Sequence, residues 1–357
     1  MLKKQLQDLL NKKSDNNEFS GVVLIKKGDK ELFSGTYGYA NMSWEIKNTL
    51  ETKLRIASVS KMFTAVAILQ LIEDGEVDFN TKVIEYLGMK GTKIPKEVDI
   101  YSLLTHTSGI ADYFDENGSD EEWEKLWSEK PIYTVRKLAD YVPMFAYDEP
   151  VFKVGEKFQY NSAGYILLGL VIEKASGKSY FDYIRDNVFS KLNMKDTDFI
   201  SLDRVHKNVA EGYEPIEDKE GNIVNWERNI YTATPGAASD GGATSTAADI
   251  MVFIQQLRNG KILSEELRKR MLTPQVLDQG ADGFRDYVWK YGYGNWFILD
   301  NDNNIVRGGH TGEEYGVSCR VYYYPNLDID VVILGNQGWC AGSLGWDIHD
   351  IILNSEL

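Results

Sequence analysis

The sequence predicts an α/β protein of the α+β type, in which an antiparallel sheet is flanked by N- and C-terminal helices and interrupted by a mainly helical domain. Two observations lead to this fold class: strand-like segments occur at both ends of the 357-residue chain, and helices with long loops fill its middle. We therefore predict a discontinuous sheet domain at residues 1–60 plus 285–357 and a helical domain at residues 61–284. A small-molecule site is expected in the cleft between them.

The N-terminal part predicts one helix and one hairpin. Residues 1–10 have the pattern of an amphipathic helix. Residues 19–26 are apolar and β-branched, and a Lys-Gly-Asp turn separates them from the strand-like residues 31–39. These elements form the first edge of the predicted sheet.

The sequence pattern predicts helices in the middle of the chain and an antiparallel meander of strands at its end. The apolar run 166–174 is closed by Gly177, and Thr246 with Asp249 resembles a capping box before a helix at 247–258. Turn sequences rich in Asp, Asn and Pro separate the later strand-like runs. Those runs lie at 291–299, 305–310, 315–324 and 329–336, and a helix at 343–353 closes the chain.

Composition excludes several classes of function. The formal net charge is -15, with 54 acidic against 39 basic residues, which disfavours a nucleic-acid partner or an anionic membrane surface. Four scattered histidines and two cysteines make no metal-binding cluster, so we expect neither a metal nor a cofactor. Cys319 and Cys340 are expected to be buried free thiols.

The sequence lacks the marks of a membrane span or a secretion signal. No stretch of about 18 uninterrupted apolar residues occurs, so no membrane span is expected. The N-terminus has no apolar signal-peptide core. We therefore expect a cytoplasmic protein, or a secreted one if a leader has been removed.

Residues 55–73 contain the strongest chemical signal. Ser58 and Lys61 stand three residues apart at the start of a run that is apolar on almost every side until Gly75. Such a helix must be buried, with its first turn facing a cavity, and the i, i+3 spacing lets the amine reach the hydroxyl. Desolvation would lower the pKa of Lys61 and make it a neutral base, while helix N–H groups could stabilise an oxyanion. Alone, this short pattern equally fits a helix cap and a surface charge.

Two further motifs make the pattern specific. Tyr160-Asn161-Ser162 and His310-Thr311-Gly312 follow Ser58-Val-Ser-Lys61 in this order. The set resembles the serine β-lactamase and penicillin-binding superfamily, in particular the branch with class C β-lactamases, D-alanyl-D-alanine carboxypeptidases and related esterases. The likeness covers roughly residues 21–336.

The resemblance implies a role for each motif. Ser58 would attack a carbonyl carbon, Lys61 would take or shuttle its proton, and Tyr160 would help to move the proton to the leaving group. His310 stands where most β-lactamases have lysine, which is more like the peptidase and esterase members. The resemblance also implies that substrate is bound by Asn161, Ser162, Thr311, Gly312 and the backbone N–H of Glu313, which would form an oxyanion hole with the N–H of Ser58.

The sequence departs from the family pattern at one position of the second motif. Ser162 occupies a place that is usually Asn, and Asn161 stands one residue earlier. The shorter side chain of Ser162 is expected to reach the substrate amide and Lys61 less well.

Two other features remain outside the motif set. His106 is expected to be a structural histidine that ties its loop together. The acidic segment 111–130 is typical of a solvated face, although Trp123 and Trp127 could pack it over a cleft as a lid.

These features predict a serine hydrolase that acts through an acyl-enzyme on a peptide, amide or ester. A D-amino-acid peptidase, a carboxypeptidase-like enzyme or an esterase fits best. A β-lactamase proper and a penicillin-binding or scaffold protein without turnover are the alternatives. The partner would be a small-molecule substrate, and the natural substrate, deacylation step and oligomeric state stay open.

Overall fold

Eight antiparallel strands form the main sheet of the computed structural model, which describes residues 2–114 and 119–355. Their order is β2-β1-β14-β13-β12-β11-β10-β9. The two ends of the chain meet in this sheet, because β1 pairs with β14 and places Gly21 opposite Gly335. The strands are β1 (Gly21–Lys27), β2 (Lys30–Tyr37), β9 (Val276–Leu277), β10 (Val288–Tyr291), β11 (Trp296–Leu299), β12 (Ile305–Glu314), β13 (Val317–Tyr324) and β14 (Ile329–Gly335).

The strand predicted over residues 291–299 was wrong, because this segment is a hairpin. β10 ends at Tyr291 and β11 begins at Trp296, with a turn between them. Gly294 in this turn has φ +67°, a left-handed conformation that favours glycine. A Cβ at Gly294 would lie 3.1 Å from the carbonyl oxygen of Lys61. The turn therefore packs closely on the first turn of the central helix.

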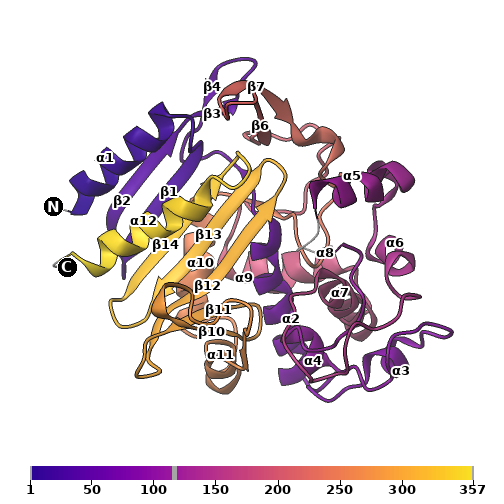
Figure 1. Cartoon of the computed structure of the whole chain (residues 1–357). Helices are drawn as coiled ribbons and strands as arrows, with labels where there is room; N and C mark the ends of the chain where they lie inside the picture. Colours follow the sequence, from indigo (N-terminus) through magenta and orange to yellow (C-terminus); the bar gives the residue numbers. More distant parts are fainter. Residues whose placement is uncertain (1, 115–118, 356–357) are drawn as a thin grey trace.

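Two terminal helices cover one face of the sheet. α1 (Leu2–Asp15) and α12 (Ala341–Leu353) lie side by side across it (Figure 1). Leu6 and Leu10 of α1 and Ile348 of α12 are almost fully buried in the layer between helices and sheet. The predicted sheet with flanking terminal helices is thereby confirmed.

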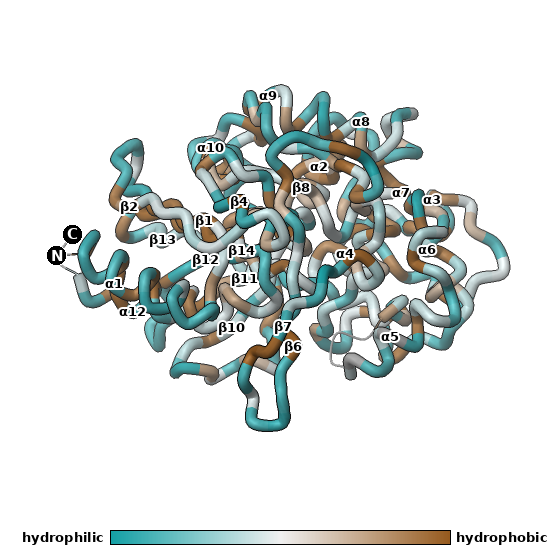
Figure 2. Tube along the Cα trace, turned by 90° about the horizontal axis from the view of Figure 1, so that it is seen from above, coloured by the Kyte–Doolittle hydropathy of each residue, from teal (hydrophilic) through white to brown (hydrophobic). Residues whose placement is uncertain are grey.

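The other face of the sheet packs on a larger, mainly helical body. Its centre is α2 (Lys61–Glu73), which is buried from its first residue through Leu71 because it is apolar all round (Figure 2). α7 (Ser162–Ser176) and α10 (Ala247–Arg258) pack around the same core. A 3-10 turn, η1 (Ala57–Ser60), leads directly into α2.

The remaining elements are short. Two of them, β6 and β7, form a hairpin that projects from the body (Figure 2). The set is β3 (Tyr39–Asn41), β4 (Ile46–Lys47), β5 (Leu54–Arg55), α3 (Val83–Leu87), α4 (Ile100–Leu104), α5 (Asp120–Glu129), η2 (Ile132–Thr134), α6 (Leu138–Tyr141), η3 (Val142–Met144), α8 (Tyr180–Ile184), η4 (Arg185–Phe189), α9 (Ser190–Leu192), β6 (Tyr213–Glu217), β7 (Ile223–Arg228), η5 (Asn229–Tyr231), β8 (Thr244–Ser245), α11 (Glu265–Met271) and η6 (Phe284–Asp286).

The capping box predicted before α10 is only half formed. The Thr246 side chain accepts a hydrogen bond from the Asp249 backbone N–H at 3.2 Å. The Asp249 carboxylate instead accepts from the Asp196 N–H and the Thr197 hydroxyl, both at 2.8 Å. Asp249 therefore ties α10 to the segment after α9 rather than closing its own helix end.

Both cysteines are free and buried, as predicted. Among the described helices, none is long and apolar enough to cross a membrane. The division into residues 1–60 plus 285–357 and residues 61–284 stays a prediction.

Candidate active site

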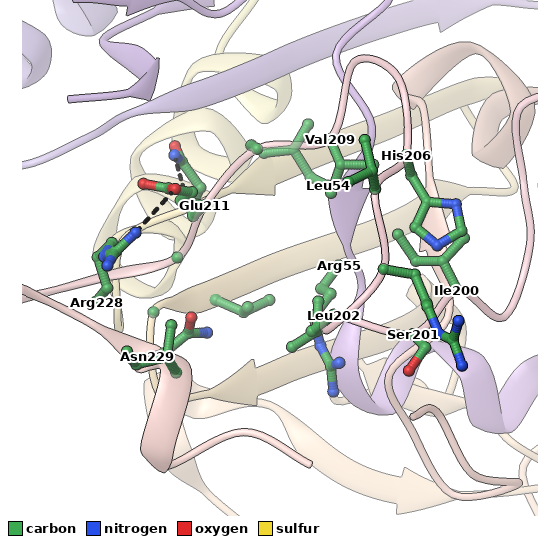
Figure 3. Close-up of a pocket in the computed structure, with 18 of the residues that line it drawn as sticks. Leu54, Arg55, Ile200, Ser201, Leu202, His206, Val209, Glu211, Arg228 and Asn229 are labelled. Carbon is green, nitrogen blue, oxygen red and sulfur yellow. Dashed lines mark hydrogen bonds and ion pairs between the residues drawn. The ribbon is translucent and has the colours of Figure 1, made fainter. Parts of the chain in front are cut away.

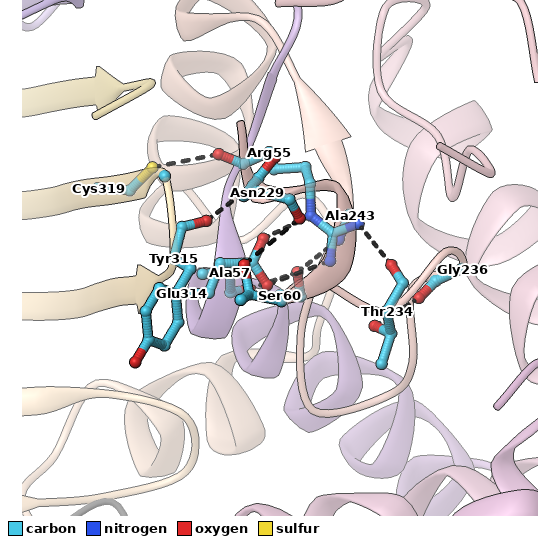
Figure 4. Close-up of polar contacts among 12 residues, drawn as sticks. Arg55, Ala57, Ser60, Asn229, Thr234, Gly236, Ala243, Glu314, Tyr315 and Cys319 are labelled. Atoms are coloured by element: carbon cyan, nitrogen blue, oxygen red, sulfur yellow. Dashed lines mark hydrogen bonds and ion pairs between the residues drawn. The ribbon is translucent and has the colours of Figure 1, made fainter. Parts of the chain in front are cut away.

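The serine of the first motif lies in a strained and tightly held turn. Ala57, directly before Ser58, has φ +43°, an unusual backbone conformation for a residue with a side chain. The Ser60 hydroxyl donates to the Ala57 carbonyl at 2.8 Å and accepts from the Ala243 N–H at 3.1 Å (Figure 4). The Gly242 N–H also donates to the Ala57 carbonyl, at 3.3 Å. These bonds fix the turn that presents Ser58.

The amine of Lys61 is buried against the serine. The Lys61 side chain has no exposed surface, and its Nζ lies 3.0 Å from Ser58 Oγ. Two more oxygens surround it, Ser162 Oγ at 3.2 Å and the Asp240 carbonyl at 2.8 Å. The amine thus has three polar partners that lie close enough for hydrogen bonds.

Ser162 reaches Lys61 despite its short side chain, contrary to the expectation from the sequence. The reason is its backbone: the Asp112 carboxylate accepts hydrogen bonds from the N–H groups of Ser162 at 2.6 Å and Ala163 at 2.9 Å. Asp112 thereby holds the N-terminus of α7 and fixes Ser162 beside the amine.

Asn161 caps the same helix. Its Oδ1 accepts from the Gly164 N–H at 2.7 Å, and its Nδ2 donates to the Ile110 carbonyl at 3.0 Å. The side chain is buried and lies outside the residues that line the cavity at Ser58. Substrate binding by Asn161 therefore stays a prediction. The position of its side chain outside the cavity wall does not favour it.

Tyr160 presents the face of its ring to the amine. Lys61 Nζ lies 4.8 Å from the ring centroid. The ring stacks on Trp296 with centroids 6.1 Å apart, and His106 packs on it at 4.4 Å. An aromatic face at this distance can stabilise a positive charge.

His310 is fully buried and both of its ring nitrogens are used. Nδ1 lies 2.5 Å from the Thr311 carbonyl, and Nε2 lies 3.0 Å from the Tyr291 hydroxyl. A carbonyl can only accept, so Nδ1 carries the proton and Nε2 accepts from Tyr291. Burial, and next the nearby Lys61, lower the pKa of His310 to about 3. The imidazole is therefore neutral at physiological pH.

His106 is also buried and structural. Its Nδ1 accepts from the Asn161 backbone N–H at 3.1 Å, which ties its loop to the start of α7. Burial, with a smaller effect of Lys61, holds the pKa of His106 well below its usual value. The structural role expected for this residue agrees with this geometry.

Gly312 lets β12 approach the nucleophile turn. A Cβ at this position would lie only 2.4 Å from the Ile56 carbonyl oxygen and 3.3 Å from Ala57 Cβ. The next residue, Glu313, lines the same cavity as Ser58. Thr311 and Gly312 themselves are not among the lining residues.

Arg55 clamps the nucleophile segment to the same strand. Its guanidinium forms a two-point ion pair with the Glu314 carboxylate and donates to the Thr234 carbonyl at 3.2 Å (Figure 4). On the neighbouring loop, Asn229 donates to the Tyr315 carbonyl at 2.7 Å. No sequence motif marks this clamp, because the partners of Arg55 lie more than 170 residues away along the chain.

A cavity of about 190 Å³ opens at Ser58. The sequence analysis missed two polar residues in its wall, Tyr113 and Asp240. The Tyr113 hydroxyl donates to Asp240 Oδ2 at 2.6 Å, and burial raises the pKa of both groups. The cavity is lined by Ala57, Ser58, Tyr113, Phe114, Trp123, Ser162, Asp240, Gly241, Glu313, Glu314, Tyr315 and Trp339.

The acidic segment 111–130 therefore contributes to the site. Trp123 of α5 lines the cavity and stacks on Tyr315 with centroids 6.0 Å apart and ring planes at 15°. Phe114 contacts Trp123 edge-on at 4.6 Å. Phe114 and Trp123 of this segment thus form part of the cavity wall, the lid role stays a prediction, and residues 115–118 lie outside the described residues.

A second cavity of about 300 Å³ has Arg55 in its wall (Figure 3). Leu54, Val209 and His206 line it on one side, and Arg228, which pairs with Glu211, lines another. Neither Ser58 nor Lys61 lines this second cavity. The smaller cavity is the candidate active site because it holds the nucleophile. Across residues 2–114 and 119–355, no group of three His, Cys, Asp or Glu side chains could hold a metal ion.

Comparisons with known proteins agree with the three motifs. The β-lactamase family profile matches residues 6–338. A penicillin-binding protein of Bacillus subtilis strain 168 is 28% identical over 346 residues, which are 94% of this chain and 72% of that protein.

Two solved structures have the same fold over nearly the whole chain. A penicillin-binding protein from Bacillus halodurans is 35% identical, with a TM-score of 0.86 over 98% of this chain and 99% of that chain. An octameric penicillin-binding protein homologue from Pyrococcus abyssi is 27% identical, with a TM-score of 0.82 over 98% of this chain and 76% of that chain.

Proposed function

The chain belongs to the β-lactamase family, and from this premise we propose that it is a serine hydrolase that forms an acyl-enzyme on Ser58. The observation that carries the proposal is the buried amine of Lys61, 3.0 Å from the Ser58 hydroxyl. A serine hydroxyl is a poor nucleophile until an adjacent base takes its proton. A desolvated lysine can serve as that base, because burial disfavours its charged form.

The contacts of Lys61 suit both protonation states. As a neutral amine, it accepts the Ser58 proton on its lone pair and donates its two N–H groups to Ser162 Oγ and the Asp240 carbonyl. After the transfer, the ammonium has three N–H groups and the same three oxygens around it. The ring face of Tyr160 then stabilises the new charge. These three oxygens lie within hydrogen-bond distance of the amine before and after the transfer.

Acyl transfer follows in two steps. Ser58 Oγ bonds to the substrate carbonyl carbon, the carbonyl oxygen becomes an oxyanion, and Lys61 holds the serine proton. When the tetrahedral intermediate collapses, the bond to the leaving group breaks and Lys61, with Tyr160 as the proposed relay, returns that proton to it. Water then attacks the ester by the reverse sequence and frees Ser58.

The oxyanion would be bound by the backbone N–H groups of Ser58 and Glu313. The close approach of β12 to the nucleophile turn at Gly312 and the Arg55–Glu314 ion pair both support this assignment. We propose that the neutral His310 acts from β12 by holding Tyr291 and the Thr311 carbonyl, rather than as a cation that binds substrate. Thr311 stays a proposed substrate contact.

The substrate class that we propose is a peptide, amide or ester, in particular a peptide that contains a D-amino acid. The test measures hydrolysis of p-nitrophenyl acetate and covalent labelling by a fluorescent penicillin, each beside Ser58→Ala. We expect the wild type to hydrolyse the ester and Ser58→Ala to lose activity by at least about 1,000-fold. Equal rates for the two proteins, with no labelling of either, would refute a serine hydrolase.

A further inference from the structure

Two oxygens that contact the Lys61 amine belong to other parts of the fold. Besides Ser58 Oγ, the amine lies 3.2 Å from Ser162 Oγ and 2.8 Å from the Asp240 carbonyl. Ser162 is the first residue of α7, and Asp240 lies in the loop before β8. A lysine amine sits on a flexible stem, so its position is set by the groups that it contacts. The groups that hold these two oxygens therefore also hold the proposed base.

Asp112 holds the first of these oxygens. Its carboxylate accepts hydrogen bonds from the backbone N–H groups of Ser162 at 2.6 Å and Ala163 at 2.9 Å. It also accepts from the N–H of the next residue, Tyr113, at 2.8 Å. A carboxylate that binds two N–H groups at the N-terminus of a 15-residue helix is favoured by charge as well as by geometry. Asp112 thereby fixes both the start of α7 and the backbone of Tyr113.

Tyr113 holds the residue that carries the second oxygen. The Tyr113 hydroxyl donates to Asp240 Oδ2 at 2.6 Å. Burial raises the pKa of Tyr113 well above its usual value, so the hydroxyl keeps its proton and stays a donor. Asp240 presents its backbone carbonyl to Lys61. The side-chain hydrogen bond therefore anchors the residue whose carbonyl contacts the amine.

Adjacent residues of one loop thus hold both oxygens, although α7 and the loop before β8 are distant in sequence. The next residue of that loop, Phe114, lies in the cavity wall and contacts Trp123. We infer that Asp112 and Tyr113 are positioning residues, which act on the reaction only through Lys61. The inference rests on the proposed function, since it concerns the base of the same reaction.

Two conservative substitutions test the two contacts. In Asp112→Asn an amide NH₂ replaces one carboxylate oxygen, so one N–H group at the start of α7 loses its acceptor. Tyr113→Phe removes only the hydroxyl. Because a displacement of about 1 Å can cost about 100-fold in rate, we expect kcat/KM for p-nitrophenyl acetate to fall by about 10- to 100-fold in Asp112→Asn. Loss of one hydrogen bond to a carboxylate should lower it by about 10-fold in Tyr113→Phe.

Each substitution has a matched control outside the site. Asp99 accepts from the Ser102 N–H at 3.0 Å at the start of α4, so Asp99→Asn also weakens a helix N-terminus. The Tyr213 hydroxyl donates to the Glu211 carboxylate at 2.7 Å, so Tyr213→Phe removes the same kind of hydrogen bond. Neither Asp99 nor Tyr213 lines the cavity at Ser58. We expect both controls to keep kcat/KM within about threefold of the wild type, and equal losses in controls and test variants would overturn the inference.

The Lys61→Ala background separates positioning of the lysine from a general effect on the fold. If both residues act through Lys61, Asp112→Asn and Tyr113→Phe should change the residual kcat/KM of Lys61→Ala by less than about twofold. A loss as large as in the wild-type background would show that they act independently of the lysine. That result would overturn the inference and leave the hydrolase intact.

A spectroscopic readout decides the inference even if the protein hydrolyses no ester. The carbon NMR signal of Lys61 Cε is identified by its absence from the spectrum of Lys61→Ala. This signal should move in Asp112→Asn and Tyr113→Phe, because the surroundings of the amine change, and stay in place in the two control variants. A signal that moves in neither test variant, or that moves equally in the controls, would overturn the inference.

Discussion

The substitution Gly312→Ala tests how β12 positions the proposed oxyanion hole. The new Cβ would lie 2.4 Å from the Ile56 carbonyl oxygen, a contact that real Cβ atoms essentially never make below 3.0 Å. The strand and the nucleophile turn must therefore separate by at least about 0.6 Å, since neither contacting atom belongs to a flexible side chain end. The backbone of Gly312 is not in the left-handed region, so the effect comes from this contact alone.

The separation moves the N–H of Glu313 relative to the N–H of Ser58. Loss of one oxyanion donor costs about 100- to 1,000-fold in rate, so we expect kcat of Gly312→Ala to fall by about 100-fold with a smaller change in KM. Overpacking costs about 1–3 kcal/mol, less than the stability of a typical domain, so the protein should stay folded.

The assay is p-nitrophenyl acetate hydrolysis at 25 °C, with thermal unfolding to confirm the fold. Gly236→Ala is the matched control, because a Cβ there meets nothing within 4 Å and its backbone is not left-handed. If Gly312→Ala keeps activity within about threefold of Gly236→Ala, the placement of the oxyanion hole between β12 and the nucleophile turn is wrong.

Three further predictions concern the base, the buried histidine and the arginine clamp. Lys61→Ala should lower kcat/KM for p-nitrophenyl acetate by about 100- to 10,000-fold without unfolding the protein, and unchanged rates would exclude a general-base role. His310 has a folded pKa of about 3 against an ordinary value of 6.5, so its contribution to stability is present above pH 6.5 and is lost as pH falls toward 3. Urea unfolding should show about 2 kcal/mol lost through this group between pH 7 and pH 5, and a His310→Gln variant that is equally sensitive to acid would contradict this. Removing one member of the Arg55–Glu314 pair should lower the free energy of unfolding by about 3 kcal/mol, and the Arg55→Ala/Glu314→Ala double variant should lose less than the sum, whereas strict additivity would show no coupling.

The parts of the fold that follow local patterns were predictable from sequence. The all-round apolar run after Lys61 implied a buried helix, and strand-like runs at both chain ends implied one sheet built from both ends of the chain. The hairpin at Gly294 was missed because its two short strands read as one continuous run. The turn of this hairpin packs against α2, and a contact between distant segments cannot be read from a local sequence pattern.

The site was predictable only where its residues fall into short motifs. The spacing of Ser58 and Lys61 implied their contact directly. Asp112, Tyr113 and Asp240 were missed, because their roles depend on contacts made 50 to 127 residues away along the chain. Trp339 was not predicted as a cavity residue either, because its exposure and its backbone conformation are properties of the folded chain.

The central claim is that Ser58 carries the acyl group, and trapping that group tests it most directly. The wild type is mixed with p-nitrophenyl acetate, quenched in acid within the first turnovers, and digested for peptide mass spectrometry. We expect an acetyl group on the peptide that contains Ser58, and on no peptide of the Ser58→Ala protein. An acetyl group on another residue, or sustained turnover by Ser58→Ala, would contradict the mechanism.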